Sequence, residues 1–274
     1  MAQTENKLRI PETLRKVKNI VGIFSAKGGV GKSAISLQIA LALKEKGFKV
    51  GLVDADIYGP SQPVMLNSSA GELQLTQNKI IEPLKKEGIK FISMGLISNE
   101  KMPVIWRGPM VSGAVMQLLS QTDWGELDFL IVDTPPGTGD VQLTLLQRIP
   151  LTSSIVVTTP QKVAVSDCKK GIEMINKLNL PISGLIENMS WFQPDDSEKR
   201  YYLFGKNGGK ELSKEYSLDL LAQLPLVELG EDSDIQNNPL LQKEFDKISD
   251  KLTASIKLLK EKKSTGIPQI NINK

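Results

Sequence analysis

The sequence contains no histidine and only one cysteine, Cys168, in 274 residues. The absence of histidine excludes imidazole as a catalytic base and as a metal ligand. A single cysteine excludes an intrachain disulfide framework and favours a reducing compartment. Lys and Arg together number 34 and Asp and Glu 31, so the net charge of +3 is too small to indicate a nucleic-acid partner.

Long apolar runs are missing as well. None approaches the ~20 residues that span a bilayer, and the N-terminus carries Glu5 and Glu12 instead of the continuous apolar segment of a signal peptide. These absences predict a cytoplasmic protein and disfavour a membrane or nucleic-acid partner. The 40% apolar content favours one large α/β domain.

Short apolar runs alternate with helical patterns along the chain. Strands are predicted at residues 20–24, 48–54, 89–94, 129–133, 154–158, 182–187 and 218–224. Helices are predicted at residues 31–46, 110–121, 138–148, 163–178, 207–216 and 239–263. This alternation indicates a mostly parallel sheet with helices on both faces. We expect an N-terminal arm at 1–18, one domain at 19–263 and a disordered tail at 264–274.

The strongest motif connects the first predicted strand to the first predicted helix. It predicts a phosphate-binding loop, and therefore a three-layer P-loop NTPase, with these nucleotide-binding residues: Ala26, Lys27, Gly28, Gly29, Val30, Gly31, Lys32 and Ser33. The glycines leave backbone N–H groups open to an anion, and the helix N-terminus adds partial positive charge. Lys32 is expected to reach the β and γ phosphates and Ser33 to bind Mg²⁺. Ala26 departs from the strict motif, which has glycine there.

Acidic residues follow two of the predicted strands. Asp54 ends the second predicted strand and Asp56 follows it, where a carboxylate can face the loop and hold Mg²⁺ or orient the attacking water. Asp133 ends an apolar strand in a Walker B pattern and is expected near the metal through water. Solvated turn aspartates and buried strands that merely end in aspartate are the alternative interpretations.

A lysine at each end of the loop, Lys27 and Lys32, resembles the deviant Walker A loop of the MinD/ParA superfamily. Further runs resemble the Mrp/ApbC-type ATPases, a family of iron–sulfur cluster carriers, and the resemblance covers about residues 18–240. These runs are Asp-x-Asp-x-x-Gly-Pro-Ser at 54–61, Trp-Arg-Gly-Pro-Met at 106–110, Asp-Thr-Pro-Pro-Gly-Thr-Gly-Asp at 133–140, Glu-Asn-Met-Ser-Trp-Phe at 187–192 and Phe-Gly-x-x-Gly-Gly at 204–209.

The resemblance implies an ATPase that uses ATP and Mg²⁺ as a homodimer with nucleotide at the interface. It implies that Lys27 reaches the partner's nucleotide, so that Lys27, Lys32 and Asp56 are the catalytic residues and Ser33, Asp56 and Asp133 serve the metal. Asn188 and Pro225 match positions beside the adenine, although Asn188 could instead cap its own backbone. Iron–sulfur assembly proteins or apo-targets are the implied partners.

One family feature is missing. The Cys-x-x-Cys that holds a bridging iron–sulfur cluster in these proteins aligns with Pro194 and Ser197, and neither supplies a thiolate. Cys168 does not replace them, because it lies on an apolar stripe at helical spacing and is expected to be buried. The nucleotide site is therefore kept and the cluster site is absent.

Two alternative functions remain open at the level of sequence. One is a MinD/ParA-like positioning ATPase that acts at a membrane or on DNA through its lysine-rich C-terminal helix, and the other is an adaptor for a cysteine-bearing homologue. The predicted helix at 239–263 has one apolar face, formed by Phe245, Ile248, Leu252, Ile256 and Leu259. Packing of this face on the sheet is the favoured interpretation.

Overall fold

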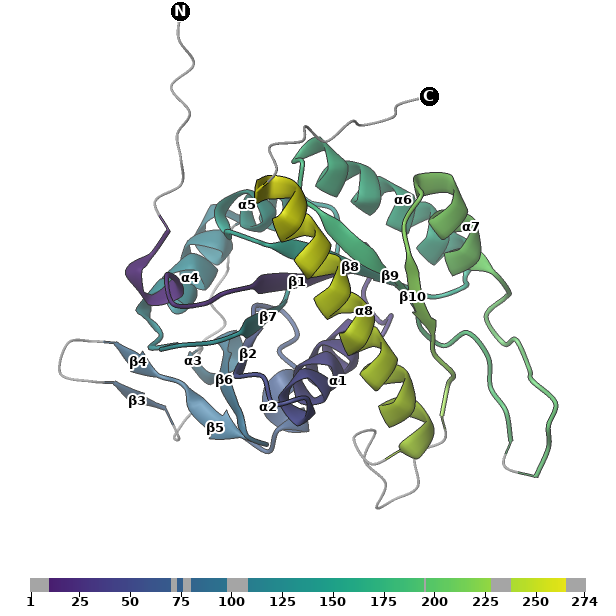
Figure 1. The fold of residues 1–274 in the computed structure, drawn as a ribbon, viewed down its shortest axis with the longest axis horizontal. Helices are drawn as coiled ribbons and strands as arrows, with labels where there is room; N and C mark the ends of the chain where they lie inside the picture. Colours follow the sequence, from purple (N-terminus) through teal and green to yellow (C-terminus); the bar gives the residue numbers. More distant parts are fainter. Residues whose placement is uncertain are drawn as a thin grey trace, which may run out of the picture.

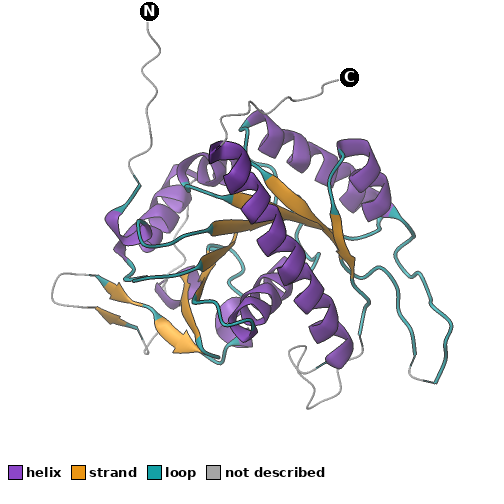
Figure 2. Ribbon diagram, viewed as in Figure 1, coloured by secondary structure: helices purple, strands orange, loops and turns teal. Residues whose placement is uncertain are grey.

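The computed structural model describes residues 10–69, 73–75, 80–97, 108–194, 196–227 and 238–264. Its centre is an eight-stranded sheet with the order β10-β9-β8-β1-β7-β2-β6-β5, parallel throughout except for β5 (Figures 1 and 2). The strands are β1 (Ile20–Phe24), β2 (Val50–Asp54), β5 (Leu84–Lys86), β6 (Ile89–Ser93), β7 (Phe129–Asp133), β8 (Ser153–Thr158), β9 (Ile182–Glu187) and β10 (Leu220–Gln223). Every residue of β1, β2 and β7 is buried, as their continuous apolar sequences require.

Helices cover both faces of this sheet. One hydrophobic cluster packs α1 (Lys32–Glu45) and α8 (Pro239–Ser264) on one face. A second cluster packs four helices on the opposite face, namely α4 (Gly108–Gln121), α5 (Asp140–Arg148), α6 (Lys162–Lys177) and α7 (Gly208–Tyr216). The predicted three-layer α/β architecture is therefore confirmed (Figure 2).

The seven predicted strands and six predicted helices all occur within a few residues of their expected bounds. The sequence did not reveal the shortest elements: the 3₁₀ turn η1 (Glu12–Leu14), the helices α2 (Gln62–Met65) and α3 (Met94–Ile97), the small hairpin of β3 (Gln74–Leu75) and β4 (Ile81–Glu82), and β5. β5 pairs with β6 through a two-residue turn, Glu87–Gly88, in which both residues have positive φ. This turn type joins tight hairpins, but Glu-Gly is a weak sequence signal for it.

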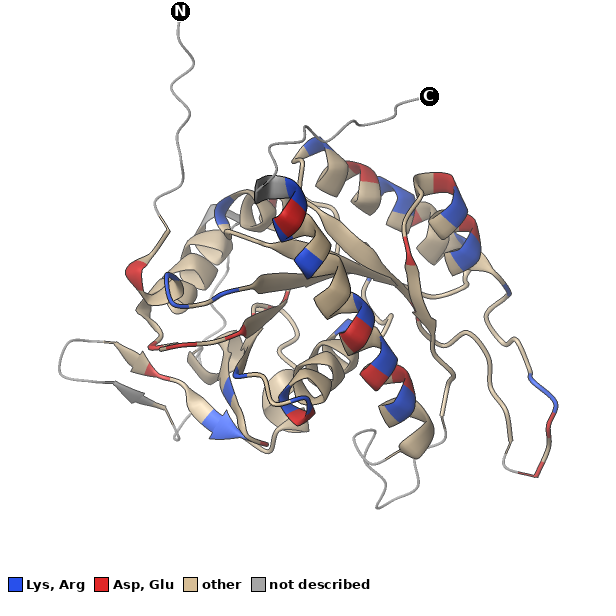
Figure 3. Cartoon of the chain, viewed as in Figure 1, with Lys and Arg blue, Asp and Glu red and all other residues tan. Residues whose placement is uncertain are grey.

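The C-terminal helix α8 lies on the sheet, as favoured. Phe245, Ile248, Leu252 and Ile256 are buried in the cluster that contains α1, and Figure 3 shows charged residues of both signs along the rest of the helix. Its apolar face is thus occupied within the chain. In the part of the chain that the structure describes, no helix is long and apolar enough to cross a membrane.

The predicted arm and tail are described only in part. Leu14 is buried in the core, and the Thr13 hydroxyl donates to the carbonyl oxygen of Ser120, so η1 packs against α4. Residues 1–9 and 265–274 lie outside the described part of the chain, as do Trp106 and Arg107 of the family run.

Candidate nucleotide site

Three parallel strands deliver the predicted site residues to one edge of the sheet. β1 lies beside β7, and β7 lies beside β2, with Asp54 directly opposite Asp133 in the register. The loop between β1 and α1 begins at the same edge, and the N–H of Gly137 donates to the carbonyl oxygen of Ser25. The structure therefore brings the glycine loop and both acidic strand ends together, as expected for the carboxyl edge of a parallel sheet.

The loop backbone has the form that a phosphate cradle needs. Gly29 and Gly31 have φ of 77° and 82°, in the left-handed region where a side chain is strained. Gly31 caps α1 without any side-chain hydrogen bond, and the first turn carries no acid, so its N–H groups stay open to an anion. Gly171 of α6 lies against this loop: a Cβ there would be 2.5 Å from the Phe24 ring and 3.3 Å from the Ala26 methyl carbon.

Lys32 is held inside this site by a carboxylate. Its ammonium forms an ion pair with Asp133, and their side chains are 6% and 0% exposed. The Ser36 hydroxyl donates to the same oxygen at 3.1 Å, and Gln62 Nε2 donates to the other oxygen at 3.1 Å. Asp133 thus accepts from three donors, and a phosphate in the loop would compete with it for Lys32.

Asp54 is the second buried carboxylate of the site. It accepts hydrogen bonds from the Ser93 hydroxyl at 2.9 Å and from the backbone N–H groups of Asp56 and Gln62. Burial, reinforced by the nearby charge of Asp133, raises the pKa of Asp54 to about 7. The motifs predicted an acidic group at Asp54 and Asp56 but gave no signal for Gln62 or Ser93.

Asp56 is turned toward its own loop. Its Oδ1 accepts the N–H groups of Tyr58 and Gly59 at 3.1 and 3.2 Å. Its side chain also lines a cavity of about 620 Å³ together with Pro136 and Gln142, which belong to the segment after β7. The segments that follow β2 and β7 therefore face each other across an open space.

The donor set suits Mg²⁺ only when phosphate is present. The Ser33 hydroxyl, Asp56 and Asp133 offer oxygen atoms, the ligands that this hard cation prefers. Within the described ranges, however, no three acidic or cysteine side chains converge to form an all-protein metal site. Mg²⁺ characteristically takes one or two carboxylates, water and substrate phosphates, so these residues fit a metal that arrives with nucleotide.

Asn188, at the end of β9, contacts the loop directly. Its Nδ2 donates to the carbonyl oxygen of Val30 at 2.9 Å, and its backbone N–H donates to Thr158. The alternative that Asn188 caps its own backbone is therefore wrong. A role beside the adenine stays a prediction.

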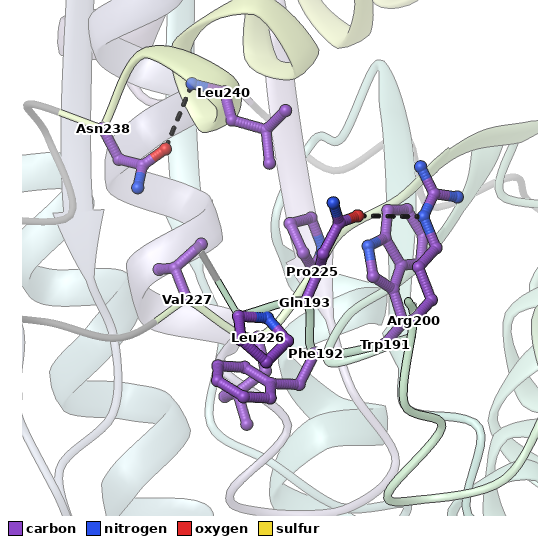
Figure 4. A pocket seen from close by; sticks show the side chains of 10 residues that line it. Trp191, Phe192, Gln193, Arg200, Pro225, Leu226, Val227, Asn238 and Leu240 are labelled. Carbon is purple, nitrogen blue, oxygen red and sulfur yellow. Dashed lines mark hydrogen bonds between the residues drawn. The ribbon is translucent and has the colours of Figure 1, made fainter. Parts of the chain in front are cut away.

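Pro225 lines a different cavity, of about 390 Å³, shown in Figure 4. The Arg200 guanidinium lies 4.4 Å from the centre of the Trp191 ring on one side of this cavity, and Arg200 Nε donates to Gln193. Leu226 and Leu240 line it as well. A volume of this size falls within the range of small-molecule pockets.

Lys27 differs from Lys32 in its surroundings. It is exposed on the loop and makes no hydrogen bond or ion pair with any residue in the described ranges. Lys32 is thus buried and paired within its own site, whereas Lys27 is exposed to solvent.

The segment aligned with the family's cysteines forms a short hairpin. Phe192 and Tyr201 exchange both backbone hydrogen bonds, and Ser197 Oγ accepts the N–H of Lys199 between them. Cys168 lies elsewhere, 1% exposed on α6, and burial raises the pKa of its thiol to about 12. Its predicted burial is confirmed.

Comparisons with known proteins agree with this site. A family model described as ParA, NUBPL iron-transfer P-loop NTPase, matches residues 16–259. The chain belongs to this family.

Its relatives include carriers of different lengths. The chain is 43% identical over 269 residues to an iron–sulfur cluster carrier protein of Methanocaldococcus jannaschii, covering 95% of this chain and 92% of the relative. It is 46% identical over 235 residues to a carrier of the same name from Synechocystis, covering 84% of this chain but only 66% of that relative.

A solved structure is similar as well. It is a nucleotide-binding protein from Archaeoglobus fulgidus in complex with ADP, with a TM-score of 0.69 and 30% identity, covering 88% of this chain and 90% of the other. The predicted family and fold are confirmed by these matches.

Proposed function

We propose that this iron-transfer P-loop NTPase is a Mg²⁺-dependent, ATP-hydrolysing dimeric switch. It serves iron–sulfur cluster assembly but binds no cluster itself, because it lacks the Cys-x-x-Cys motif. The observation that carries the proposal is the open N-terminus of α1, with Lys32 and Ser33 set beside two acidic strand ends. The relatives named iron–sulfur cluster carriers and the ADP complex of the Archaeoglobus fulgidus protein support the same conclusion.

Each residue of the site has its own role in hydrolysis. The N–H groups of the loop and Lys32 bind and neutralise the β and γ phosphates. Ser33 and Asp56 would hold Mg²⁺, with Asp133 acting on it through water, and the bound ion would supply neutralisation of developing charge. Asp56 orients the attacking water. Lys27 supplies positive charge to the partner's nucleotide, which its exposure on the loop allows. Asn188 and Pro225 are proposed to contact the adenine.

The first test is ATP binding and hydrolysis with Mg²⁺ and with a chelator. Lys32→Gln is the preferred variant, because glutamine can still donate to buried Asp133, whereas Lys32→Ala strands that charge. Binding measured by calorimetry is expected to vanish in Lys32→Gln while its circular dichroism stays native. Lys170→Gln, an exposed lysine paired with Asp167 on α6, is the matched control and is expected to behave as wild type. ATP affinity of wild-type strength in Lys32→Gln would contradict the assignment.

The missing cysteines favour a second candidate, an adaptor that pairs with a cysteine-bearing homologue. In that case the chain supplies one nucleotide site and the partner supplies the thiolates that a cluster needs. Co-purification of this chain with such a homologue, with iron bound only to the mixed dimer, is the expected result. Iron bound equally by this chain alone would remove the reason for an adaptor.

A further inference from the structure

Gln62 joins three parts of the nucleotide site, although no motif includes it. Its side chain is fully buried at the start of α2. Nε2 donates to the carbonyl oxygen of Ser33 at 2.8 Å and to Asp133 at 3.1 Å, and its backbone N–H donates to Asp54 at 3.3 Å. One residue thus connects the phosphate loop with both acidic strand ends.

The other end of this amide is free. Gln62 Oε1 is buried and has no hydrogen-bond partner among the described residues. The orientation of the amide follows from its neighbours, because both atoms beside Nε2 are oxygens that only accept. An acceptor left without a donor in the interior is unfavourable, so Oε1 calls for a donor from outside the chain.

Three donors close to Gln62 form hydrogen bonds with other acceptors. The Lys32 ammonium pairs with Asp133, the Ser36 hydroxyl bonds Asp133 and the carbonyl oxygen of Lys32, and the Ser93 hydroxyl bonds Asp54. A nucleotide would bring phosphate oxygens to this end of the loop, but these are acceptors and cannot pair with Oε1. Water bound to Mg²⁺ can donate a hydrogen bond, and Mg²⁺ usually keeps several of its waters when it binds with phosphates.

We propose that Gln62 is a positioning residue for the metal: Oε1 accepts a hydrogen bond from water bound to Mg²⁺, while Nε2 holds Asp133 and the loop together when the phosphates draw Lys32 away. The inference rests on the proposed function and extends it to a residue outside the motifs. It predicts that Gln62 affects how tightly the metal-loaded nucleotide binds, and has much less effect on the nucleotide alone.

The test is the affinity of Gln62→Met for a non-hydrolysable ATP analogue, measured by calorimetry in excess Mg²⁺ and in EDTA. Methionine keeps the length of the side chain and removes both amide functions. The gain in affinity on adding Mg²⁺ is expected to fall about 10-fold or more, the usual effect of losing a partner of a metal's ligands. Affinity in EDTA is expected to fall less, because only the Nε2 hydrogen bonds to Ser33 and Asp133 are lost there.

Thr122→Val is the control. It removes a buried side-chain hydrogen bond outside the nucleotide site, from the Thr122 hydroxyl to the carbonyl oxygen of Leu118, so the ratio of affinities with and without Mg²⁺ is expected to be preserved. Equal losses for Gln62→Met in Mg²⁺ and in EDTA, or the same ratio change in Thr122→Val, would overturn the inference. If Gln62→Met does not fold, Gln62→Asn replaces it, because its amide is one methylene too short to reach the same partners. The same ratio of affinities with and without Mg²⁺ then decides. Failure of the wild type to bind the analogue in Mg²⁺ would instead refute the proposed function.

Discussion

Lys32 and Asp133 neutralise each other in the nucleotide-free chain, so nucleotide binding has to separate a buried ion pair. Leaving one member of such a pair uncompensated typically costs ~3–5 kcal/mol. The phosphates must therefore replace Asp133 as counter-ion, while Ser36 and Gln62 keep that carboxylate hydrogen-bonded. In this arrangement, phosphate binding changes the environment of the acidic strand end directly.

The other buried acid gives a prediction about pH. The usual pKa of aspartate is about 3.9, and burial raises the pKa of Asp54 to about 7. The folded chain therefore holds this proton more tightly than the unfolded chain does, and the stability that this provides at low pH is lost as the pH rises through the folded pKa.

Asp54→Asn is expected to remove the loss of folding stability at rising pH, because the amide stays neutral. In nucleotide-free protein, the melting temperature of the variant is expected to rise relative to wild type as the pH increases from about 4, the usual aspartate pKa, to about 7, and to keep a constant difference above that. Thermal melts across this range check the prediction. A constant difference between the two proteins at all pH values would show that Asp54 does not titrate in this way.

At the residue scale, motif spacing predicted Lys32, Ser33, Asp56 and Asp133 because a phosphate loop places residue types at fixed positions. It could not predict Ser93 and Gln62. Ser93 reaches Asp54 only because β6 pairs with β2 in a register that sets these two residues side by side. That register depends on packing across the sheet, which no local pattern encodes.

At the scale of elements, the glycine pair that opens α7 has a packing role. Glu187, buried at the end of β9, accepts the N–H of Gly209 at the start of that helix, along with the Ser190 hydroxyl and the Gln223 amide. A carboxylate at a helix N-terminus is favourable. Since Asn188 follows Glu187, this network fixes the strand end that contacts the phosphate loop.

Gly208→Ala tests this packing. A Cβ on Gly208 would lie 2.6 Å from Val165 Cγ2 and 3.1 Å from Pro160 Cα, so α7 would have to shift. We expect a loss of about 1–3 kcal/mol in the free energy of unfolding, as for other overpacked sites. Gly113→Ala on α4 is the control, because nothing lies within 4 Å of its Cβ, and a gain of up to about 1 kcal/mol is expected from helix propensity. Denaturant unfolding of both variants measures the difference, and equal effects would argue against tight packing at α7.

Long elements were predictable because each repeats its period several times. α8 is an example, since its apolar positions predicted a face that the structure buries. β3, β4 and β5 have two or three residues each, too few for any period to be read. Their pairing depends on the turns that join them and, for β5, on its place at the edge of the sheet.

At the scale of the whole molecule, the outward-facing Lys27 requires a second subunit if it is to act in catalysis. Positive charge supplied in trans stabilises the transition state only in the assembled site, as an arginine finger does. The chain alone, with Lys32 on its own carboxylate and Lys27 exposed, fits an inactive state that dimerisation completes.

Mixing two inactive variants tests action in trans. Lys27→Ala is expected to bind nucleotide but lose hydrolysis, and Asp56→Ala to lose hydrolysis through its own site. In a mixed dimer, the intact Lys27 of the Asp56→Ala subunit faces the site that retains Asp56, so up to one site per dimer recovers. ATPase rates across mixing ratios provide the measurement, and rates that stay at the level of the separate variants would count against cross-subunit catalysis.

The central claim, a nucleotide switch that works without a cluster of its own, is tested most directly by counting iron and assaying ATPase activity in one sample. The protein is purified anaerobically, reconstituted with iron and sulfide, and compared with Cys168→Ala. Because burial holds the Cys168 thiol protonated, with a pKa of about 12, we predict Mg²⁺-dependent ATP hydrolysis and no stable iron–sulfur absorbance in either protein. A stoichiometric cluster on the wild type that disappears in Cys168→Ala, or an absence of ATP hydrolysis, would contradict the account.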